Sequence, residues 1–533
     1  MTEEITISEQ DLRNEEYKEI RNKIVMQKDV PEQYVILAEY FLQKYKIKTN
    51  WFTKEIFIYK EGIFEPNGEC FLLQEIQHII PAWKRGAKAE VLDKIMTNTY
   101  FVDNIFNKQN IIVVENGVIK LDALALNHED FFDGFSPDYL ATKKLHVIFN
   151  PTALCPKIDQ FLSDVTCQNK DFKIYLIEVF ADILNNHYKS QKGHIFIGEG
   201  ENGKGTYMRL IVAFVGIENK TSLGLEYIQE NSFQVYMLQN SMVNLIGDSN
   251  DKYVKDSGLV KKIIGEDYVS ANIKNVKKPL EFINTAKMII GGQHVMKTSE
   301  DSWAWYRRFI ITDWTYKVPE NKKNEDFEKQ LHDPKELSGL LNLVLERYKI
   351  FANHKFKFEL HNNMKEEDIR KNHLLKSNPV KLFIETELVM TSDEESVLKK
   401  DVYIAYCEWQ QKNNAKEKSE NYFHKELKKE LPDIPTKQID RKRHYMGLGI
   451  KASLTNYVMV QSDIPIERLS YKDEILFLIK HGPETGLFNE DLFRQLKADN
   501  YTDSQQIIEG LDQLLQNGQI YEPKPEYFKI FIP

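Results

Sequence analysis

The chain has 533 residues, 42% of them hydrophobic and 28% charged, with a formal net charge of −9. These values predict a globular protein of three to five domains and exclude a disordered or fibrous one, while the acidic balance disfavours a protein that simply coats nucleic acid. No apolar run reaches the roughly 20 residues of a membrane span, the acidic start predicts no signal peptide, and the four cysteines form no CxxC pair, so we expect a cytoplasmic protein without disulfides or zinc.

The first part of the chain alternates helical and hairpin patterns. After a polar lead-in, residues 35–47 have the apolar spacing of a helix. Residues 55–66 and 111–122 each predict a β-hairpin, the second at Asn116-Gly117, a dipeptide typical of tight turns. Residues 161–184 predict helices that lead into a short strand at 194–198. From there to about residue 314, strands and helices alternate as in an α/β nucleotide-binding core.

A glycine-rich loop follows this strand and precedes an apolar helix. The residues expected to bind the nucleotide are Gly198, Gly200, Asn202, Gly203, Lys204, Gly205 and Thr206. Glycines let backbone N–H groups face phosphates, the helix N-terminus adds partial positive charge, and Lys204 would reach the β- and γ-phosphates of ATP. An ordinary glycine-rich turn between a strand and a helix is the alternative interpretation.

The loop departs from the usual phosphate-loop pattern at one position. A hydroxyl residue normally follows the lysine directly and ligates Mg²⁺. Here Gly205 follows Lys204, and the hydroxyl comes one residue later, at Thr206. Either Thr206 ligates the metal through a shifted turn, or water fills that ligand position.

Polar residues follow the later strands of the predicted core. Residues 242–247 form an apolar strand that ends at Asp248, with Asp251 three residues later, where a phosphate-loop enzyme holds Mg²⁺ and orients water. A buried strand ending in a solvated aspartate is the alternative. Gln293 ends a second apolar strand and could sense the γ-phosphate. Arg307 and Arg308 precede a third and could act on a neighbouring subunit's ATP, although a surface ion pair is the simpler interpretation.

These motifs, in this order, resemble the superfamily 3 helicases, and in particular the poxvirus- and phage-type primase-helicase group with its D5-like domain. The resemblance spans about residues 100–350 and is carried by four stretches. They are LHVIFNPTALCPKIDQFL, QKGHIFIGEGENGKGT, LVKKIIGEDYVSANIKNVKKPLEF and the block from AKMIIGGQ to SWAWYRRFIITDW.

The resemblance implies an AAA+-like core that acts as a ring, usually a hexamer, with ATP sites between subunits. It implies that Lys204 and Thr206 belong to the phosphate loop, Asp248 to the acidic strand, and Arg307 or Arg308 to the neighbour's site. Gln293 stands where the family usually has asparagine, and a second acid beside Asp248 is missing. A family hairpin that touches single-stranded DNA corresponds to the region of Lys274, Lys277 and Lys278.

The C-terminal part predicts two further modules. Residues 397–451 resemble the small helical and winged module of phage primase-helicases, with an aromatic face at helical spacing and a basic cluster at Arg441, Lys442 and Arg443. Residues 465–533 predict helices at 472–480 and 490–498, a turn at Asn517-Gly518 and a strand ribbon, which resembles the winged helix of minichromosome-maintenance helicases. A protein-contact role is as plausible for this last module as direct DNA reading.

The predicted fold is therefore α/β: an AAA+-like phosphate-loop NTPase core with an α+β N-terminal region and C-terminal winged-helix modules. The predicted boundaries are 1–110 for an accessory region, 111–190 for a D5-like domain, 191–350 for the motor, and 378–460 and 465–533 for the winged modules.

The sequence predicts an ATP- and Mg²⁺-dependent DNA helicase of a phage, plasmid or mobile element. Its expected partners are single-stranded DNA, origin or fork DNA, further copies of itself, and a primase or other replication proteins, with no membrane partner. An ATP-switched DNA-binding initiator without strong motor activity is the alternative, since Gly205 and Gln293 depart from the family pattern. A small-molecule kinase fits the length and the basic hairpin region poorly.

Overall fold

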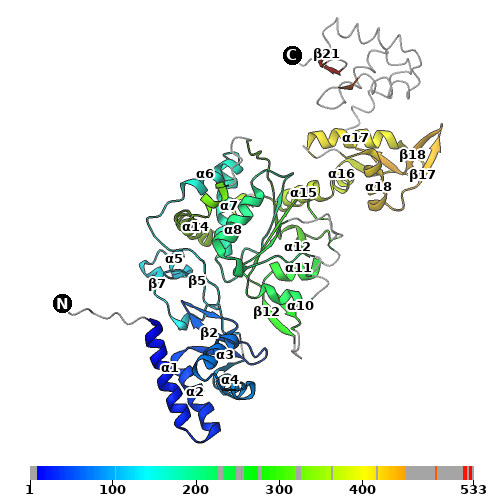
Figure 1. Ribbon diagram of the computed structural model, residues 1–533. Helices are drawn as coiled ribbons and strands as arrows, with labels where there is room; N and C mark the ends of the chain where they lie inside the picture. Colours follow the sequence, from blue (N-terminus) through cyan, green and yellow to red (C-terminus); the bar gives the residue numbers. More distant parts are fainter. Residues whose placement is uncertain are drawn as a thin grey trace. The chain divides into compact units, whose positions relative to one another are not determined.

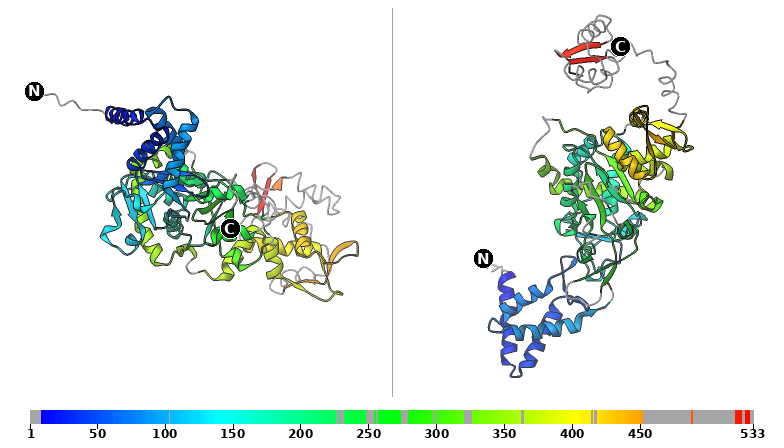
Figure 2. Two further views of the ribbon diagram at one scale, coloured as in Figure 1. Left: turned by 90° about the horizontal axis from the view of Figure 1, so that it is seen from below. Right: turned by 90° about the vertical axis from the view of Figure 1, so that its right-hand side faces the viewer.

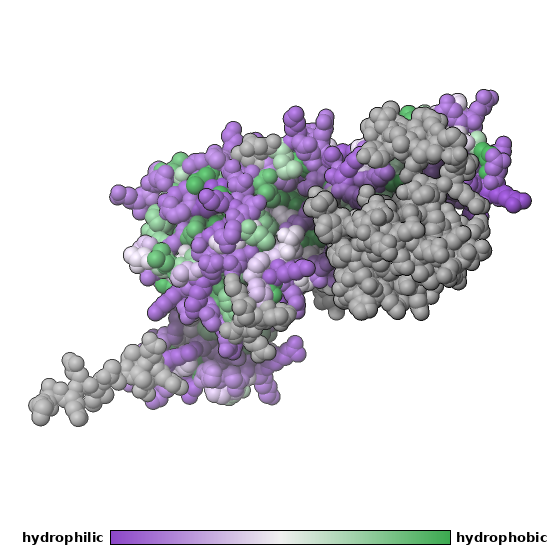
Figure 3. Space-filling model, turned by 90° about the horizontal axis from the view of Figure 1, so that it is seen from above, coloured by the Kyte–Doolittle hydropathy of each residue, from purple (hydrophilic) through white to green (hydrophobic). Residues whose placement is uncertain are grey.

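The computed structural model describes residues 9–102, 104–225, 228, 232–247, 254, 257–273, 279–296, 298, 300–319, 326–361, 364–413, 415, 418–451, 487–488, 520–524 and 527–530. The chain forms two compact units, Met1–Pro379 and Val380–Pro533 (Figure 1). No helix among the described residues is long and apolar enough to cross a lipid bilayer. On the face drawn in Figure 3, hydrophobic side chains lie scattered among hydrophilic ones, which is ordinary for a protein surface.

The first unit begins with four helices around a four-stranded sheet of order β3-β2-β1-β4 (Figure 2, blue). These elements are α1 (Glu9–Met26), α2 (Val30–Lys44), β1 (Ile47–Asn50), β2 (Ile56–Lys60), β3 (Ile63–Glu65), α3 (Gly68–Ile79), α4 (Arg85–Thr99) and β4 (Tyr100–Phe101). The predicted helix at 35–47 and hairpin at 55–66 are confirmed as α2 and the β2–β3 pair. Glu61 and Gly62, both with positive φ, form its two-residue turn.

A second hairpin belongs to the three-stranded sheet β5-β6-β7. Its strands are β5 (Ile111–Val114), β6 (Gly117–Lys120) and β7 (Phe132–Asp133), followed by no further strand before residue 193 among the described residues. The predicted hairpin is confirmed, but its two-residue turn is Glu115-Asn116, because Val114 pairs with Gly117. Gly117 is needed for space: a Cβ there would lie 2.5 Å from the carbonyl oxygen of Asp133.

The centre of the first unit is a five-stranded sheet of order β14-β8-β13-β10-β9 in which every neighbouring pair is parallel. Its strands are β8 (Gly193–Ile197), β9 (Lys220–Thr221), β10 (Val243–Ile246), β13 (Lys287–Gly292) and β14 (Phe309–Asp313). They confirm the strands predicted at 194–198, at 242–247, before Gln293 and after Arg308. All six residues of β13 are buried, as expected for a central parallel strand.

Helices cover both faces of this sheet (Figure 1). One face shares a hydrophobic core with α6 (Pro156–Val165), α7 (Lys170–Ile183), α8 (Lys204–Val215) and α14 (Pro334–Asn353). The remaining elements are α5 (Leu121–Ala125), α10 (Ser232–Val235), α11 (Ser257–Ile264), β11 (Tyr268–Ala271), β12 (Leu280–Ile283), α12 (Trp303–Tyr306), α13 (Asp326–Leu331) and α15 (Glu366–Ser377). α15 packs against α12, since His373 of α15 is buried and its ring lies 4.9 Å from the ring of Tyr306.

The second unit begins with a helix and two short strands, followed by two helices, a hairpin and further strands. Its described elements are α16 (Pro379–Glu387), β15 (Leu388–Met390), β16 (Ser396–Leu398), α17 (Lys399–Lys412), α18 (Glu420–Glu430), β17 (Thr436–Ile439), β18 (Lys442–Met446), β19 (Leu448–Ile450), β20 (Leu487–Phe488), β21 (Ile520–Lys524) and β22 (Tyr527–Ile530). The aromatic residues at helical spacing belong to the core of this unit, since Tyr406, Trp409 and Phe423 are buried. The helices predicted at 472–480 and 490–498 and the Asn517-Gly518 turn lie outside the described residues.

Candidate nucleotide site

The loop between β8 and α8 curls tightly. Its backbone has positive φ at Gly200 (110°), Glu201 (49°) and Gly203 (81°). Gly203 is required twice over, for its left-handed backbone and because a Cβ there would lie 2.4 Å from Cγ1 of Val165. The loop therefore delivers the chain into α8 with Lys204 as the first helical residue.

Asn202 holds the loop in this shape. Only 4% of the residue is exposed. Its Nδ2 donates to the carbonyl oxygen of Trp314 at 3.1 Å, and its Oδ1 accepts from the backbone N–H of Lys204 at 3.2 Å. A Cβ on Gly198 would lie 1.8 Å from the same Nδ2. The sequence placed Asn202 in the loop but gave no sign of this bracing contact with the residue that follows β14.

Lys204 lies at the carboxyl edge of the parallel sheet. Its Nζ donates to the carbonyl oxygens of Gly198 (3.2 Å), which directly follows β8, and of Gly292 (2.7 Å), which ends β13. After β8 the chain crosses to β9, the outermost strand on one side of the sheet. After β13 it crosses in the opposite direction to β14, the outermost strand on the other side. Ligands of open α/β sheets bind at such a reversal, outside the carboxyl ends of the strands.

Gln293 lies at the same edge. It is exposed and directly follows Gly292, whose carbonyl oxygen binds the Lys204 ammonium group. Gln293, which follows β13, and Lys204, which begins α8, therefore lie at the same edge of the sheet. The end of β10 lies close as well, since a Cβ on Gly291 would be 2.9 Å from the carbonyl oxygen of Gly247. Asp248 and Asp251, which follow Gly247, lie outside the described residues and stay predictions.

Thr206 lies beside an ion pair that the sequence did not indicate. The Arg209 Nε donates to both carboxylate oxygens of Glu328, at 2.8 and 2.9 Å, and the Thr206 hydroxyl donates to Glu328 at 3.4 Å. The Arg209 guanidinium lowers the pKa of the Glu328 carboxyl. A cation within an otherwise apolar helix was the only available sign, because Glu328 is 119 residues further along the chain. Gly205 precedes this cluster, exposed on the first turn of α8.

The two adjacent arginines lie in different environments. Arg308 is 7% exposed and donates to the backbone carbonyl oxygens of Lys261 (3.0 Å) and Ala304 (2.5 Å), and burial lowers its pKa. Arg307 is partly exposed and donates to Gln191 at 3.1 Å. Both precede β14 and so lie at the amino edge of the sheet, opposite Lys204. Neither can reach a ligand at the loop of its own chain.

Two paired strands occur in the region that the resemblance matched to a DNA-contacting hairpin. β11 and β12 pair antiparallel, with Tyr268 opposite Ile283. Lys274, Lys277 and Lys278 belong to the segment between these strands and lie outside the described residues. Among the residues that the structure describes, no group of three or more His, Cys, Asp or Glu side chains is placed to hold a metal ion.

The first unit is an α/β fold with a parallel sheet, and its candidate site lies at the carboxyl edge of that sheet. Three family descriptions match its sequence: "D5 N terminal like" over residues 38–167, "Family of unknown function (DUF5906)" over 196–308, and "Poxvirus D5 protein-like" over 375–456. Two of these descriptions are D5-like, and they support a D5-like family of the primase-helicase type, as the resemblance indicated.

Solved structures of one other protein are similar over most of the chain. The A-form apo structure of the NrS-1 C-terminal region has a TM-score of 0.43 and 14% identity, and covers 78% of this chain and 98% of that one. A second A-form apo structure of this region has a TM-score of 0.39 and 13% identity, with 78% and 99% covered. At these values the likeness says nothing about function. No curated protein matches the sequence.

Proposed function

We propose that the chain is an ATP-dependent DNA helicase that translocates on single-stranded DNA as a ring, which we expect to be a hexamer. One observation carries the proposal: the Lys204 ammonium group lies between the carboxyl ends of β8 and β13, beside Gln293, at the mouth of a curled glycine loop. The matches to two D5-like family descriptions support DNA replication as the process.

The donor set at this edge fits a nucleoside triphosphate with Mg²⁺. The loop backbone, the start of α8 and the Lys204 ammonium group supply positive charge for the phosphates. Mg²⁺, when bound, would neutralise charge on the β- and γ-oxygens, with Asp248 and Thr206 as the proposed ligands. Gln293 would orient the attacking water or sense the γ-phosphate, and Asp248 or Asp251 would polarise that water. For Thr206 to ligate Mg²⁺, the hydrogen bond from its hydroxyl to Glu328 must first break.

Arg307 is the better candidate for action on a neighbouring subunit's ATP. The guanidinium of Arg308 is buried and bonded to two backbone carbonyls of its own chain, which suits a structural role. Arg307 is partly exposed and lies at the opposite sheet edge from Lys204. A ring would bring this edge of one subunit to the loop of the next. An arginine so placed stabilises the charge that develops in phosphoryl transfer.

Single-stranded DNA is the proposed substrate track. Lys274, Lys277 and Lys278, between β11 and β12, would contact its phosphates. In the second unit, the β17–β18 turn consists of Asp440 and Arg441, both with positive φ, and places Arg441, Lys442 and Arg443 at an exposed hairpin tip. This tip suits contact with the phosphates of origin or fork DNA. A primase or other replication proteins are proposed as further partners.

An ATP-switched DNA-binding initiator is the second candidate. The engagement of Thr206 by Glu328 and Arg209 favours it, because these contacts compete with metal ligation. Such a protein would bind ATP tightly and release little phosphate.

Phosphate release with and without single-stranded DNA separates the two candidates. The helicase proposal predicts DNA-stimulated release that Lys204→Ala abolishes. Lys170→Ala is the matched control, since Lys170 is also the first residue of a helix, is exposed, and lies outside the loop. Tight ATP binding with negligible release by the unmodified chain would favour the switch. Equal and substantial phosphate release by Lys204→Ala and the unmodified chain would overturn both.

A further inference from the structure

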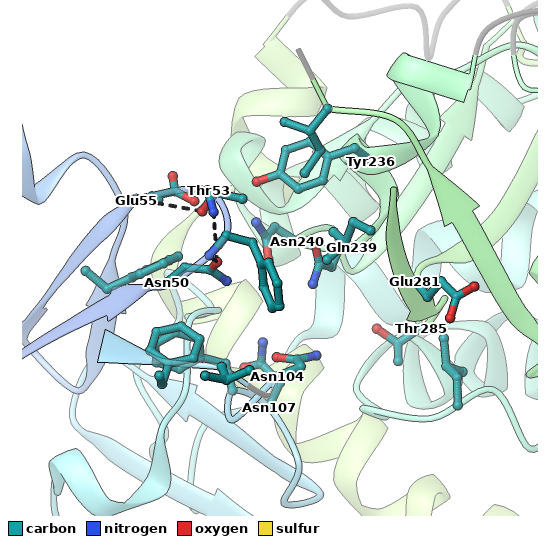
Figure 4. A pocket seen from close by; sticks show the side chains of 18 of the residues that line it. Asn50, Thr53, Glu55, Asn104, Asn107, Tyr236, Gln239, Asn240, Glu281 and Thr285 are labelled. Carbon is teal, nitrogen blue, oxygen red and sulfur yellow. Dashed lines mark hydrogen bonds between the residues drawn. The ribbon is translucent and has the colours of Figure 1, made fainter. Parts of the chain in front are cut away.

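The first unit contains a cavity of about 300 Å³ whose lining includes no residue of the nucleotide loop. Figure 4 shows the side chains that line it. One wall comes from the N-terminal α+β part, including the loop after β1 and the segment after β4. The other wall comes from the residues before β10 and from β12, the second strand of the hairpin matched to DNA contact. The cavity therefore joins the N-terminal part to the base of that hairpin.

The loop after β1 is built to present an aromatic ring. The Oδ1 of Asn50 accepts from the backbone N–H groups of Phe52 (2.9 Å) and Thr53 (3.0 Å), and Lys54 has a positive φ of 61°. These contacts fold the chain back on itself at the cavity. Phe52 lines the cavity and is 41% exposed, although its hydrophobic surface would favour burial.

Flat apolar surfaces and side-chain amides share the lining. The aromatic side chains are Phe52, Phe57, Phe101, Phe106 and Tyr236, and the amides are Asn104, Gln239 and Asn240, together with Asn50 and Asn107, whose amides hydrogen-bond within the fold. Aromatic rings stack on the face of any nucleobase, while an amide presents a donor and an acceptor side by side, as the edge of a base does. The lining therefore combines the two kinds of group that bind unstacked bases.

The charges of the lining disfavour a phosphate in the cavity itself. Its only cation among the described lining residues is Lys143, against the carboxylates of Glu55 and Glu281. The Lys143 Nζ already donates to the carbonyl oxygen of Ser241 (2.9 Å) and to Thr285 (3.2 Å), and burial lowers its pKa to about 7. The cavity thus suits a neutral, flat group with a hydrogen-bonding edge.

Cations for a sugar-phosphate backbone are available outside the cavity. Trp51, next to Phe52, stacks edge-on against Tyr100 at 4.7 Å, and the Lys54 ammonium group lies 4.2 Å from the Trp51 ring centre. Ile273 and Pro279 also line the cavity, and the residues between them in the sequence include the three lysines proposed to contact DNA. A phosphate beside the cavity would meet the Lys54 ammonium group while a base entered it.

We propose that this cavity takes one unstacked base of the single-stranded DNA on which the protein acts. The inference rests on the proposed function, because it needs single-stranded DNA to be the substrate. It adds a base-holding site between the N-terminal part and the DNA hairpin, away from the nucleotide loop. Such a site holds the strand through stacking without reading its sequence, because every base has a π-face.

Binding of two matched oligonucleotides tests the inference. One is an oligothymidylate, and the other has the same backbone with abasic sites. Phe52→Ala and Tyr236→Ala should weaken binding of the oligothymidylate about fivefold or more, and leave binding of the abasic strand unchanged. Phe135→Ala is the matched control, because Phe135 is 42% exposed and lies outside the cavity lining. It should change neither affinity.

Photo-cross-linking of the unmodified chain gives a result that does not depend on variant folding. An oligonucleotide containing 5-iododeoxyuridine should cross-link to peptides from residues 50–57 or 236–240. The inference would be overturned if Phe52→Ala bound each oligonucleotide as tightly as the unmodified chain does, or if cross-links were confined to other segments. The proposed function would stand in either case if DNA-stimulated phosphate release persisted. Failure of the unmodified chain to bind any single-stranded DNA would instead overturn the proposed function, and this inference with it.

Discussion

Replacing Asn202 with alanine should weaken both the fold and nucleotide binding. The substitution removes two hydrogen bonds, and it leaves the carbonyl oxygen of Trp314, a residue only 3% exposed, without this donor. An unsatisfied buried polar group costs about 1–3 kcal/mol. The Lys204 N–H adds little, because Lys204 is partly exposed and water can replace the lost acceptor. We therefore expect the free energy of unfolding to fall by about 1–3 kcal/mol.

The same loss should appear in nucleotide affinity, since Asn202 holds the loop in the shape that presents Lys204. A change of about 1–3 kcal/mol in loop organisation corresponds to a fall of roughly fivefold or more in affinity. Urea unfolding measures the first quantity and titration with a fluorescent ATP analogue the second. Asn98→Ala is the control, because Asn98 is exposed on α4 and its side chain donates a hydrogen bond to the carbonyl oxygen of Lys94 in the same helix. If Asn202→Ala unfolds and binds ATP as the unmodified chain does, the bracing role is refuted.

Three further substitutions have distinct expected outcomes. Gly198→Ala should abolish binding of the ATP analogue, because its Cβ would lie 2.9 Å from the backbone carbonyl oxygen of Trp314; normal binding would contradict the observed packing. Gly205→Ala should raise the free energy of unfolding by about 0.5–1 kcal/mol, since its Cβ would meet only the end of the exposed Arg209 side chain, at 3.2 Å; a destabilised protein in urea would show that Arg209 cannot move aside. Lys143→Met should stabilise the protein most below pH 7. Burial lowers the pKa of Lys143 from 10.5 to about 7, so the buried charge opposes folding fully below pH 7, and this cost disappears as the pH rises toward 10.5. A pH-independent difference in unfolding free energy between this variant and the unmodified chain would contradict the shift.

Local patterns predicted the elements that position the candidate site. The glycine loop between an apolar strand and an apolar helix identified β8 and α8, and polar residues after apolar strands identified the ends of β10 and β13. Gln293 and Lys204 lie at one edge of the sheet because the carboxyl ends of the parallel strands β8 and β13 are adjacent, a consequence of topology that sequence order alone can suggest.

Contacts between distant segments were beyond such patterns. Asn202 bonds a carbonyl oxygen 112 residues away, and Arg209 pairs with Glu328 across 119 residues, so no spacing rule connects them. Arg307 and Arg308 look equivalent in the sequence, and only burial against α11 and α12 distinguishes them. The cavity beside Phe52 is formed by segments whose functions the sequence did not link.

Complementation between two inactive variants tests most directly whether ATP sites are shared between subunits. Lys204→Ala removes the phosphate-binding lysine, and Arg307→Ala removes the arginine proposed to act across the seam. Mixed before assembly, the two variants should regain part of the DNA-stimulated phosphate release, because at some seams an intact Lys204 faces an intact Arg307. Phosphate release by the mixture no greater than the sum of the two separate variants would contradict a nucleotide site built from two subunits.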